Sequence, residues 1–388
     1  MWYQGDDIGI TALGLVSPVG YGAEVACASA RAGLTRLSEI DLLNPAGMAP
    51  LGEGPAVGHC IRQIGHGFSG YAKSLLLAEH ALSEVKSKRR LTMEEEARTG
   101  LVVILSDRYF EDRRAKEARA VQEELRNAAA TDAGDDDEDP ALDHPVPSEL
   151  WRRRCASFLP DLVGKARLAI PPERQRVLFG GHAALIEAIE ASMRAINDRI
   201  IDRAIIGAVD SLVEPAAFTA AAECGVVYSE ANPAGFFPSE AAGFFLLERA
   251  PAISLIRASS RSRDEERLAD TPALGKGLAE CIAQVLEPRA QSGRVGMAMV
   301  DLNGDAHRAQ DWGNALVRLP QTSDVRQCPT VLPALSFGET GAAQGVLAVI
   351  YASRGYQRSY WPNTRSLLVT LASESGERGA LLLEPGAK

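Results

Sequence analysis

Apolar residues along this chain follow two periods, which predict a mixture of strands and helices. Short continuous apolar runs are typical of strands buried on both faces of a sheet. Segments whose apolar residues recur every three or four positions predict helices that pack one face on that sheet. Before residue 250 the expected strands are 8–20 (ending in a Ser-Pro turn), 101–105, 204–208 and a hairpin over 236–248, and the expected helices are 23–32, 75–88 and 183–196.

The rest of the chain repeats this order loosely, although no sequence repeat is visible by eye. The expected helices are 274–286 and 341–353, and the expected strands are 296–302, 366–372 and 379–384. The polar segment 259–270 is expected to be a surface connection. Alternating strands and helices predict an α/β sheet. A length of 388 residues suggests two fused halves or two domains, and we place the division at 1–250 and 251–388.

A charged segment interrupts the first half. Residues 111–130 are highly charged and helix-forming, and they lead into an acidic stretch, 131–147, with consecutive acids at 135–139. Like charges in such a run repel one another and prevent packing, which predicts a solvated loop. A calcium loop is excluded because a glycine and a closing glutamate do not stand at the required offsets. A tether for a basic partner is the alternative.

Composition narrows the classes of function. With 46% hydrophobic and 24% charged residues, the chain can bury a large core. A formal net charge of −10 argues against nucleic acid as a partner. We expect no membrane partner, because no apolar run is long enough for a span, and no secretory signal. Six scattered cysteines without C-x-x-C pairs predict neither zinc nor disulfides, which favours a reduced, cytoplasmic protein.

Three segments place a glycine turn beside an apolar or amphipathic run. They read VLFGGHAALIEA at 177–188, DLNGDAHRAQD at 301–311 and LSFGETGAAQGVLAVI at 335–350. With ITALGLVSPVG at 10–20 and GFFPSEAAGFFLLE at 235–248, they resemble segments of the β-ketoacyl synthases, the condensing enzymes of the thiolase fold. The order of these segments along the chain is also that of the family.

The resemblance implies two similar βαβαβαββ halves in a five-layered α-β-α-β-α arrangement. It also implies a homodimer that pairs through the strand before the nucleophile, here 176–179. In that family the three segments carry a nucleophilic cysteine and two histidines. The matching positions are Leu178, Asn303 and Glu339. We therefore expect a degenerate member without the catalytic residues, and neither a cofactor nor a metal.

These replacements change the chemistry that the frame can perform. Leu178 cannot attack a thioester, although the glycine turn and helix N-terminus that would activate a cysteine remain. Asn303 keeps one hydrogen-bond donor, whereas an ionised Glu339 would repel a developing enolate. The loop 373–379, SESGERG, stands where the family has a glycine-rich turn that gates the acyl pocket. Its charges would meet any acyl chain that entered.

Four further residues are possible pocket residues. His182 stands on the first turn of an expected helix, where it is either a base for a different reaction or part of the pocket wall. Gly181 precedes it in the glycine turn. His307 lies in the segment after Asn303 and could swing inward, although a surface loop is the simpler reading. Phe337 precedes the glycine turn of the third segment.

Other reactive residues have simpler explanations. Cys155 and Cys224 are the most plausible stray nucleophiles, but neither is expected at a helix N-terminus beside a histidine. The run 152–154 of three arginines could meet an acidic carrier protein, although a solvated charge cluster is the default. Three acidic residues are expected to hold loops by hydrogen bonds: Asp210, Glu240 and Asp311.

Three functions compete. The first is a catalytically inactive protein used as a binding, adaptor or scaffolding subunit, paired with itself or with another protein such as an acyl carrier protein. The second is a non-catalytic partner of an active ketosynthase, comparable to a chain length factor. The third is an acyltransferase with altered chemistry built on His182, Asn303 and Glu339, which requires His182 and Glu339 to lie within hydrogen-bond reach.

Overall fold

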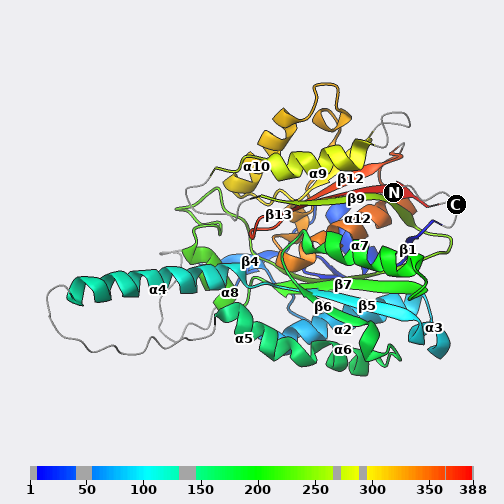
Figure 1. The fold of residues 1–388 in the computed structure, drawn as a ribbon, viewed down its shortest axis with the longest axis horizontal. Coiled ribbons are helices and arrows are strands. Elements are labelled where there is room, and N and C mark those ends of the chain that lie inside the picture. The colour runs from blue at the N-terminus through cyan, green and yellow to red at the C-terminus, as the bar shows by residue number, and fades with distance from the viewer. Residues whose placement is uncertain are drawn as a thin grey trace.

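The computed structural model describes residues 7–40, 55–130, 146–264, 272–287, 295–362 and 364–386, without side chains for 127–130. Within these ranges the backbone forms one mixed sheet of eleven strands with helices on both faces (Figure 1). The acidic stretch expected at 131–147 lies outside the described residues up to position 145. Its solvated-loop conformation therefore stays a prediction, while helix α5 (Pro147–Arg154) begins at its end.

Five strands before residue 250 form one half of the sheet, in the order β6-β5-β7-β8-β1, while β2 pairs only with β1 and the short strands β3 and β4 form a separate antiparallel pair. β5, β6 and β7 are parallel, and β8 is antiparallel to both β7 and β1. The expected hairpin over 236–248 is wrong: one strand forms there, and both its neighbours come from elsewhere in the chain. The bounds are β1 (Gly9–Ser17), β2 (Gly20–Tyr21), β3 (Leu37–Glu39), β4 (Val57–His59), β5 (Thr99–Leu105), β6 (Gln175–Phe179), β7 (Arg203–Ser211) and β8 (Glu240–Glu248).

The strands after residue 250 repeat this arrangement in the order β11-β10-β12-β13-β9. By rank along the chain both halves read 3-2-4-5-1, with the same parallel and antiparallel pairs. The two similar halves are therefore confirmed, and a short β1–β9 pairing joins them. A division near residue 250 stays a prediction. The bounds are β9 (Ser254–Arg263), β10 (Met297–Val300), β11 (Thr330–Val331), β12 (Leu367–Ala372) and β13 (Glu377–Pro385).

The surface connection expected at 259–270 is wrong in its first part. Residues up to Arg263 belong to β9, which pairs with β13 along its whole length. Beyond Leu255, β9 has no second neighbour in the described sheet, because its pairing with β1 covers only residues 254 and 255. That open edge explains why polar serines and arginines can occupy a strand. Positions 265–270 lie outside the described residues.

Helices form three layers around the two half-sheets. Buried residues of α7 (Ala184–Asn197) and α12 (Gln344–Arg358) form one central core with strands from both halves. α2 (Gly70–Lys88) and α6 (Phe158–Ala166) cover the outer face of the first half, and α9 (Lys276–Leu286) and α10 (Ala306–Arg318) cover that of the second. The five-layered arrangement is confirmed. Every residue of α12 from 344 to 353 is buried, as its central position requires.

Strand β5 shows how local pattern and layer agree. All of its residues are buried, as expected for a parallel strand covered on both faces. Its side chains alternate: Val102 and Ile104 join the central core, whereas Leu101, Val103 and Leu105 join the outer core with α2 and α6. The continuous apolar run thus serves two cores at once.

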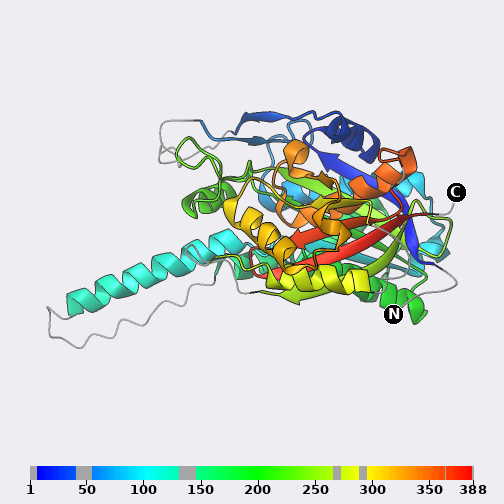
Figure 2. The ribbon, with the colours of Figure 1, turned by 90° about the horizontal axis from the view of Figure 1, so that it is seen from above.

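Of the remaining helices, α1 contributes buried residues to the central core. α4 extends far from the body of the molecule in both views (Figures 1 and 2). It confirms the helix-forming character expected at 111–130. The bounds are α1 (Ala23–Arg31), α3 (Met93–Ala97), α4 (Tyr109–Ala130), α8 (Pro215–Glu223) and α11 (Ala334–Phe337).

Candidate functional site

Segments from both halves meet at the carboxyl ends of their parallel strands. β6 ends at Phe179, and the chain turns through Gly180 and Gly181 to His182 before α7 begins. From the other half, Asp301 directly follows β10. Because these strand ends face one another, side chains far apart in the sequence come into contact here.

His182 is buried and both of its ring nitrogens are engaged. Nε2 lies 2.7 Å from Oε1 of Glu339. Nδ1 lies 3.1 Å from Oδ2 of Asp301 and 2.8 Å from Nη1 of Arg308. A protonated imidazole donates to both carboxylates, whereas a neutral one with its proton on Nε2 accepts from Arg308. In either form Nε2–H donates to Glu339, so this nitrogen cannot take a proton from a substrate.

Asp301 accepts hydrogen bonds from several elements. Its Oδ2 accepts from the backbone N–H of Ala372 at the end of β12 (2.7 Å) and from Nη1 of Arg308 (2.9 Å). Arg308 stands on the first turn of α10, where its own N–H donates to the capping residue Asp305 (3.1 Å). Its Nη2 donates to Glu374 of the β12–β13 turn (2.6 Å). The guanidinium therefore links three elements of the second half.

Glu339 is fixed through both its backbone and its side chain. Two backbone hydrogen bonds of 2.8 Å tie it to the segment that leads into β8. Its Oε1 also accepts from the N–H of Gly341 (2.8 Å), and its Oε2 accepts from Nδ2 of Asn303 (2.6 Å). Together with His182, these donors stabilise the ionised carboxylate.

The charges of this cluster depend on one another. Burial alone would lower the pKa of His182, but the charge of Glu339 and hydrogen bonds to both carboxylates raise it to about 9. Burial would raise the pKa of Glu339 and Asp301, but His182 and Arg308 hold both below their ordinary values. Arg308 has a raised pKa, because its carboxylate neighbours outweigh its burial. The cluster is thus a set of buried ion pairs.

A cavity of about 40 Å³ lies beside the cluster. A single water needs roughly 10–15 Å³ of such volume, and small-molecule pockets measure about 300–1,000 Å³. The cavity therefore admits a few water molecules and no acyl chain. Gly181 forms part of its wall, where an added Cβ would stand 2.9 Å from the side chain of Ser373. The β12–β13 turn thus packs directly on the glycine turn.

Three further carboxylates line the same cavity: Asp107, Glu111 and Asp210. Burial raises the pKa of Asp107 to about 6, and it also raises the pKa of Asp210. Asp107 accepts from the hydroxyl of Ser375 (3.2 Å), and Oδ2 of Asp210 accepts from the N–H of Ala342 (2.9 Å). The role expected for Asp210, holding a loop, matches this contact.

Only some of the predicted pocket residues line the cavity. His182 and Gly181 line the cavity, and Glu339 does so with them. Leu178 lies within β6 and packs against the central core. His307 is half-buried on the first turn of α10, and Phe337 is buried against Tyr351 at 5.9 Å between ring centroids. Neither lines the cavity.

Sequence reasoning missed three members of the cluster: Asp301, Arg308 and Glu374. Asp301 had a usable signal, since a polar residue directly after a buried parallel strand points to the edge where ligands and charges gather. Arg308 stands beside His307, and only the register of α10 decides which of the two faces inward. Glu374 lies in a turn whose approach to Arg308 depends on the pairing of β12 with β13.

Comparisons with known proteins identify the fold but not a family. No family model matches the sequence, and no curated protein matches it. One similar solved structure is a chain from the complex of a type II PKS acyl-carrier protein with its ketosynthase bound to the hexaketide. The TM-score is 0.73 and the identity is 17%, and the match covers 99% of this chain and 100% of that one. At such identity the likeness shows the fold alone.

Two further solved structures share the same fold. The oxazolomycin ketosynthase domain KS7 of Streptomyces albus is similar at TM-score 0.72 and 14% identity, covering 99% of this chain and 74% of that one. The ishigamide ketosynthase/chain length factor is similar at TM-score 0.66 and 19% identity, covering 98% and 100%. The thiolase-like fold expected from the sequence is therefore confirmed.

The described residues contain neither a membrane-spanning helix nor a cluster of metal ligands. No helix among them is both long and apolar enough to cross a membrane. No group of three or more His, Cys, Asp or Glu side chains among them could hold a metal ion.

Proposed function

We propose that this chain is catalytically inactive in condensation and serves as a binding, adaptor or scaffolding subunit built on the ketosynthase fold. The observation that most supports this proposal is the small cavity beside the turn at 180–182. Its cavity has room for a few waters only, and the polar groups beside it are already joined in buried ion pairs. A substrate would have to break that cluster to enter, at a cost of several kcal/mol.

The absence of a suitable nucleophile supports inactivity. Condensation begins with transfer of an acyl group to a nucleophile, which in the resembled family is a cysteine thiolate. None of the six cysteines lines the cavity. Burial raises the pKa of the Cys155 thiol to about 12, so roughly one molecule in 100,000 carries the thiolate at pH 7. Cys60 and Cys281 have pKa values raised by burial as well.

The altered acyltransferase ranks below this proposal. Glu339 does lie in hydrogen-bond reach of both His182 and Asn303, and its contact with His182 is the geometry that this alternative requires. However, His182 uses both ring nitrogens within the cluster, and Glu339 is held by several donors. These contacts favour a structural role over proton transfer to a substrate.

The edge of the sheet at β6 supports a homodimer. β6 ends the sheet and hydrogen-bonds only to β5 among the described strands. Three of its apolar side chains are only half-buried: Val177, Leu178 and Phe179. An open strand edge with apolar side chains is a ready template for pairing with another chain. We therefore place a second copy against 176–179.

Helix α4 supports an additional protein partner. It extends from the body, and its apolar Val121 and Leu125 are 55% and 66% exposed. Glu124 stands beside Leu125 on this helix, and the sequence continues into the acidic stretch, whereas Glu117 is already paired with Arg113 and Arg114. A partner with an apolar stripe flanked by basic residues would match this surface in polarity and charge.

A non-catalytic partner of an active ketosynthase is the second candidate. The observation in its favour is the similarity to a ketosynthase/chain length factor, together with one to an acyl-carrier protein complex. In this case β6 would pair with the active subunit, and an acyl carrier protein would be a further partner. Co-purification with a ketosynthase encoded nearby would favour this candidate over a homodimer.

Intact-protein mass spectrometry tests inactivity. The purified chain is incubated with acyl and malonyl thioesters of pantetheine and of acyl carrier protein, beside an active condensing enzyme as control. We expect no mass increase and no release of carbon dioxide. A stable acyl adduct would overturn the proposal, and peptide mapping would identify the nucleophile.

Light scattering after size exclusion tests the pairing. The wild-type chain is expected at twice its mass of 41.4 kDa. Val177→Asp places a charge on the β6 edge and should give monomers, whereas Val317→Asp, at a site 73% exposed on α10, should leave the dimer unchanged. A wild-type monomer, or a dimer that survives Val177→Asp, would refute pairing through β6.

A further inference from the structure

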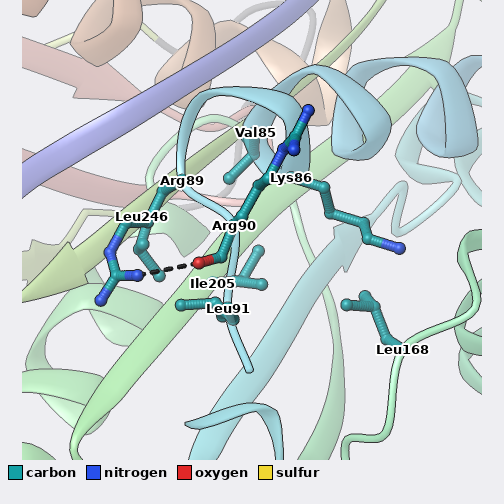
Figure 3. A pocket seen from close by; sticks show the side chains of 8 residues that line it. All are labelled: Val85, Lys86, Arg89, Arg90, Leu91, Leu168, Ile205 and Leu246. Atoms are coloured by element: carbon teal, nitrogen blue, oxygen red, sulfur yellow. Dashed lines mark hydrogen bonds between the residues drawn. The ribbon is translucent and has the colours of Figure 1, made fainter. Parts of the chain in front are cut away.

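A second cavity lies on the outer face of the first half-sheet, beside the C-terminal end of α2 (Figure 3). Its volume is about 220 Å³. Ile205 of β7 and Leu246 of β8 are directly paired across the strands and form its apolar base. Val85 of α2 and Leu168, which follows α6, complete the buried apolar lining. The lining is therefore aliphatic, with no aromatic ring in it.

Three cationic side chains surround this lining, with Arg89 and Lys86 on opposite sides (Figure 3). Arg89 is neutralised by Glu95 (2.7 Å) and Glu248 (3.2 Å). Lys86 donates to the backbone carbonyls of residues 166 and 167, and it forms no ion pair with a carboxylate in the part of the chain that the structure describes. Arg90 is exposed, and its guanidinium makes no hydrogen bond or ion pair with any described residue. The mouth of the cavity therefore carries positive charge without a counterion.

We propose that this cavity binds an aliphatic carboxylate, with its tail on Ile205 and Leu246 and its head group at Arg90. A dry apolar cavity of about 150 Å³ is known to hold benzene, so 220 Å³ accepts a somewhat larger aliphatic tail. Burying that tail removes apolar surface from water, and the carboxylate supplies the counterion that Arg90 lacks. Lys86 offsets the negative partial charge at the end of α2.

This site is separate from the cluster around His182. Ile205 precedes Asp210 by five residues in β7, which corresponds to about 17 Å along the strand. Binding here would leave the small cavity untouched. The inference therefore goes beyond the proposed function and stands or falls independently of it.

Calorimetric titration of the full chain with a series of amphiphiles tests the proposal. Octanoate is expected to bind saturably at one site. Each buried methylene contributes about fourfold in affinity, so octanoate should bind about 15-fold more tightly than hexanoate. Heptylammonium has the same seven-carbon tail with the opposite charge and should bind at least tenfold more weakly. Equal binding of octanoate and heptylammonium, or no saturable binding, would overturn the proposal.

Two variants locate the binding. Arg90→Gln should weaken octanoate about tenfold, whereas Arg153→Gln, at another exposed arginine on α5, should have no effect. Leu168→Trp fills the cavity and should abolish binding. If the Leu168→Trp variant does not fold, Arg90→Gln is sufficient to test the head-group site. Because Arg90 is exposed, its replacement should not disturb folding. Wild-type affinity in Arg90→Gln would show that the head group binds elsewhere and would refute the assignment.

Discussion

Protonation of His182 is expected to stabilise the folded chain, and His182→Gln tests this. The imidazole is 4% exposed, and its neighbours raise its pKa to about 9, from about 6.5 in an unfolded chain. Because the folded-state pKa is the higher one, the proton's stabilisation is fully present below pH 6.5. It is lost as the pH rises through 9.

The magnitude follows from these two values. At pH 6 the difference between a pKa of 9 and one of 6.5 corresponds to about 3 kcal/mol of stability. Most of this contribution remains at pH 7, and it is near zero at pH 10. Glutamine cannot carry the charge, so Asp301 and Glu339 keep only Arg308 as a cation. The variant should therefore lose stability mainly at low and neutral pH.

Guanidinium chloride unfolding, followed by circular dichroism between pH 6 and pH 10, is the assay. The stability gap between wild type and His182→Gln should shrink by about 3 kcal/mol across this range. His80→Gln, at an exposed position on α2, is the control and should cost little stability. A gap of constant size for His182→Gln would refute the argument that His182 is a buried cation.

Two other substitutions probe the same region. Gly181→Ala places a Cβ 2.9 Å from the Ser373 side chain and should destabilise the fold by about 1–3 kcal/mol, whereas Gly313→Ala, where an added Cβ meets nothing within 4 Å, should be neutral or stabilising in thermal unfolding. Asp301→Asn removes a buried partner of Arg308 and should cost about 3–5 kcal/mol. Asp202→Asn breaks an exposed pair with an arginine and should cost about 1 kcal/mol or less. Equal losses for the two asparagine variants would contradict the burial argument.

Much of the fold could be read from the local pattern. The apolar run 101–105 predicted a strand buried on both faces, and the structure places it between two cores. Residues 341–353 predicted a helix, which forms from Gln344 to Arg358. In each case hydrophobic burial dictates the element, and the same burial dictates the layer. Local periodicity and tertiary position therefore agree.

The pattern of apolar and polar residues gave wrong predictions where the pairing of distant strands decides the structure. The polar residues 259–263 suggested a surface connection, yet they form a strand because β13 offers a full row of hydrogen-bond partners. The hairpin expected over 236–248 is a single strand because β1 and β7 flank it on both sides. Such partners lie far away in the sequence, and local composition does not encode them.

The candidate site also has some features that the sequence determined and others that only the tertiary structure decided. The sequence alone determined the three glycine-containing segments, the presence of His182, Asn303 and Glu339 within them, and the lack of a cysteine there. Only the tertiary structure decided that Arg308 joins the cluster and lines the cavity, which its neighbour His307 does not line. The physical reason is that charge interactions act through space over a few ångströms. Residues more than a hundred positions apart become one ion-pair cluster only when both half-sheets pack with their strand ends together.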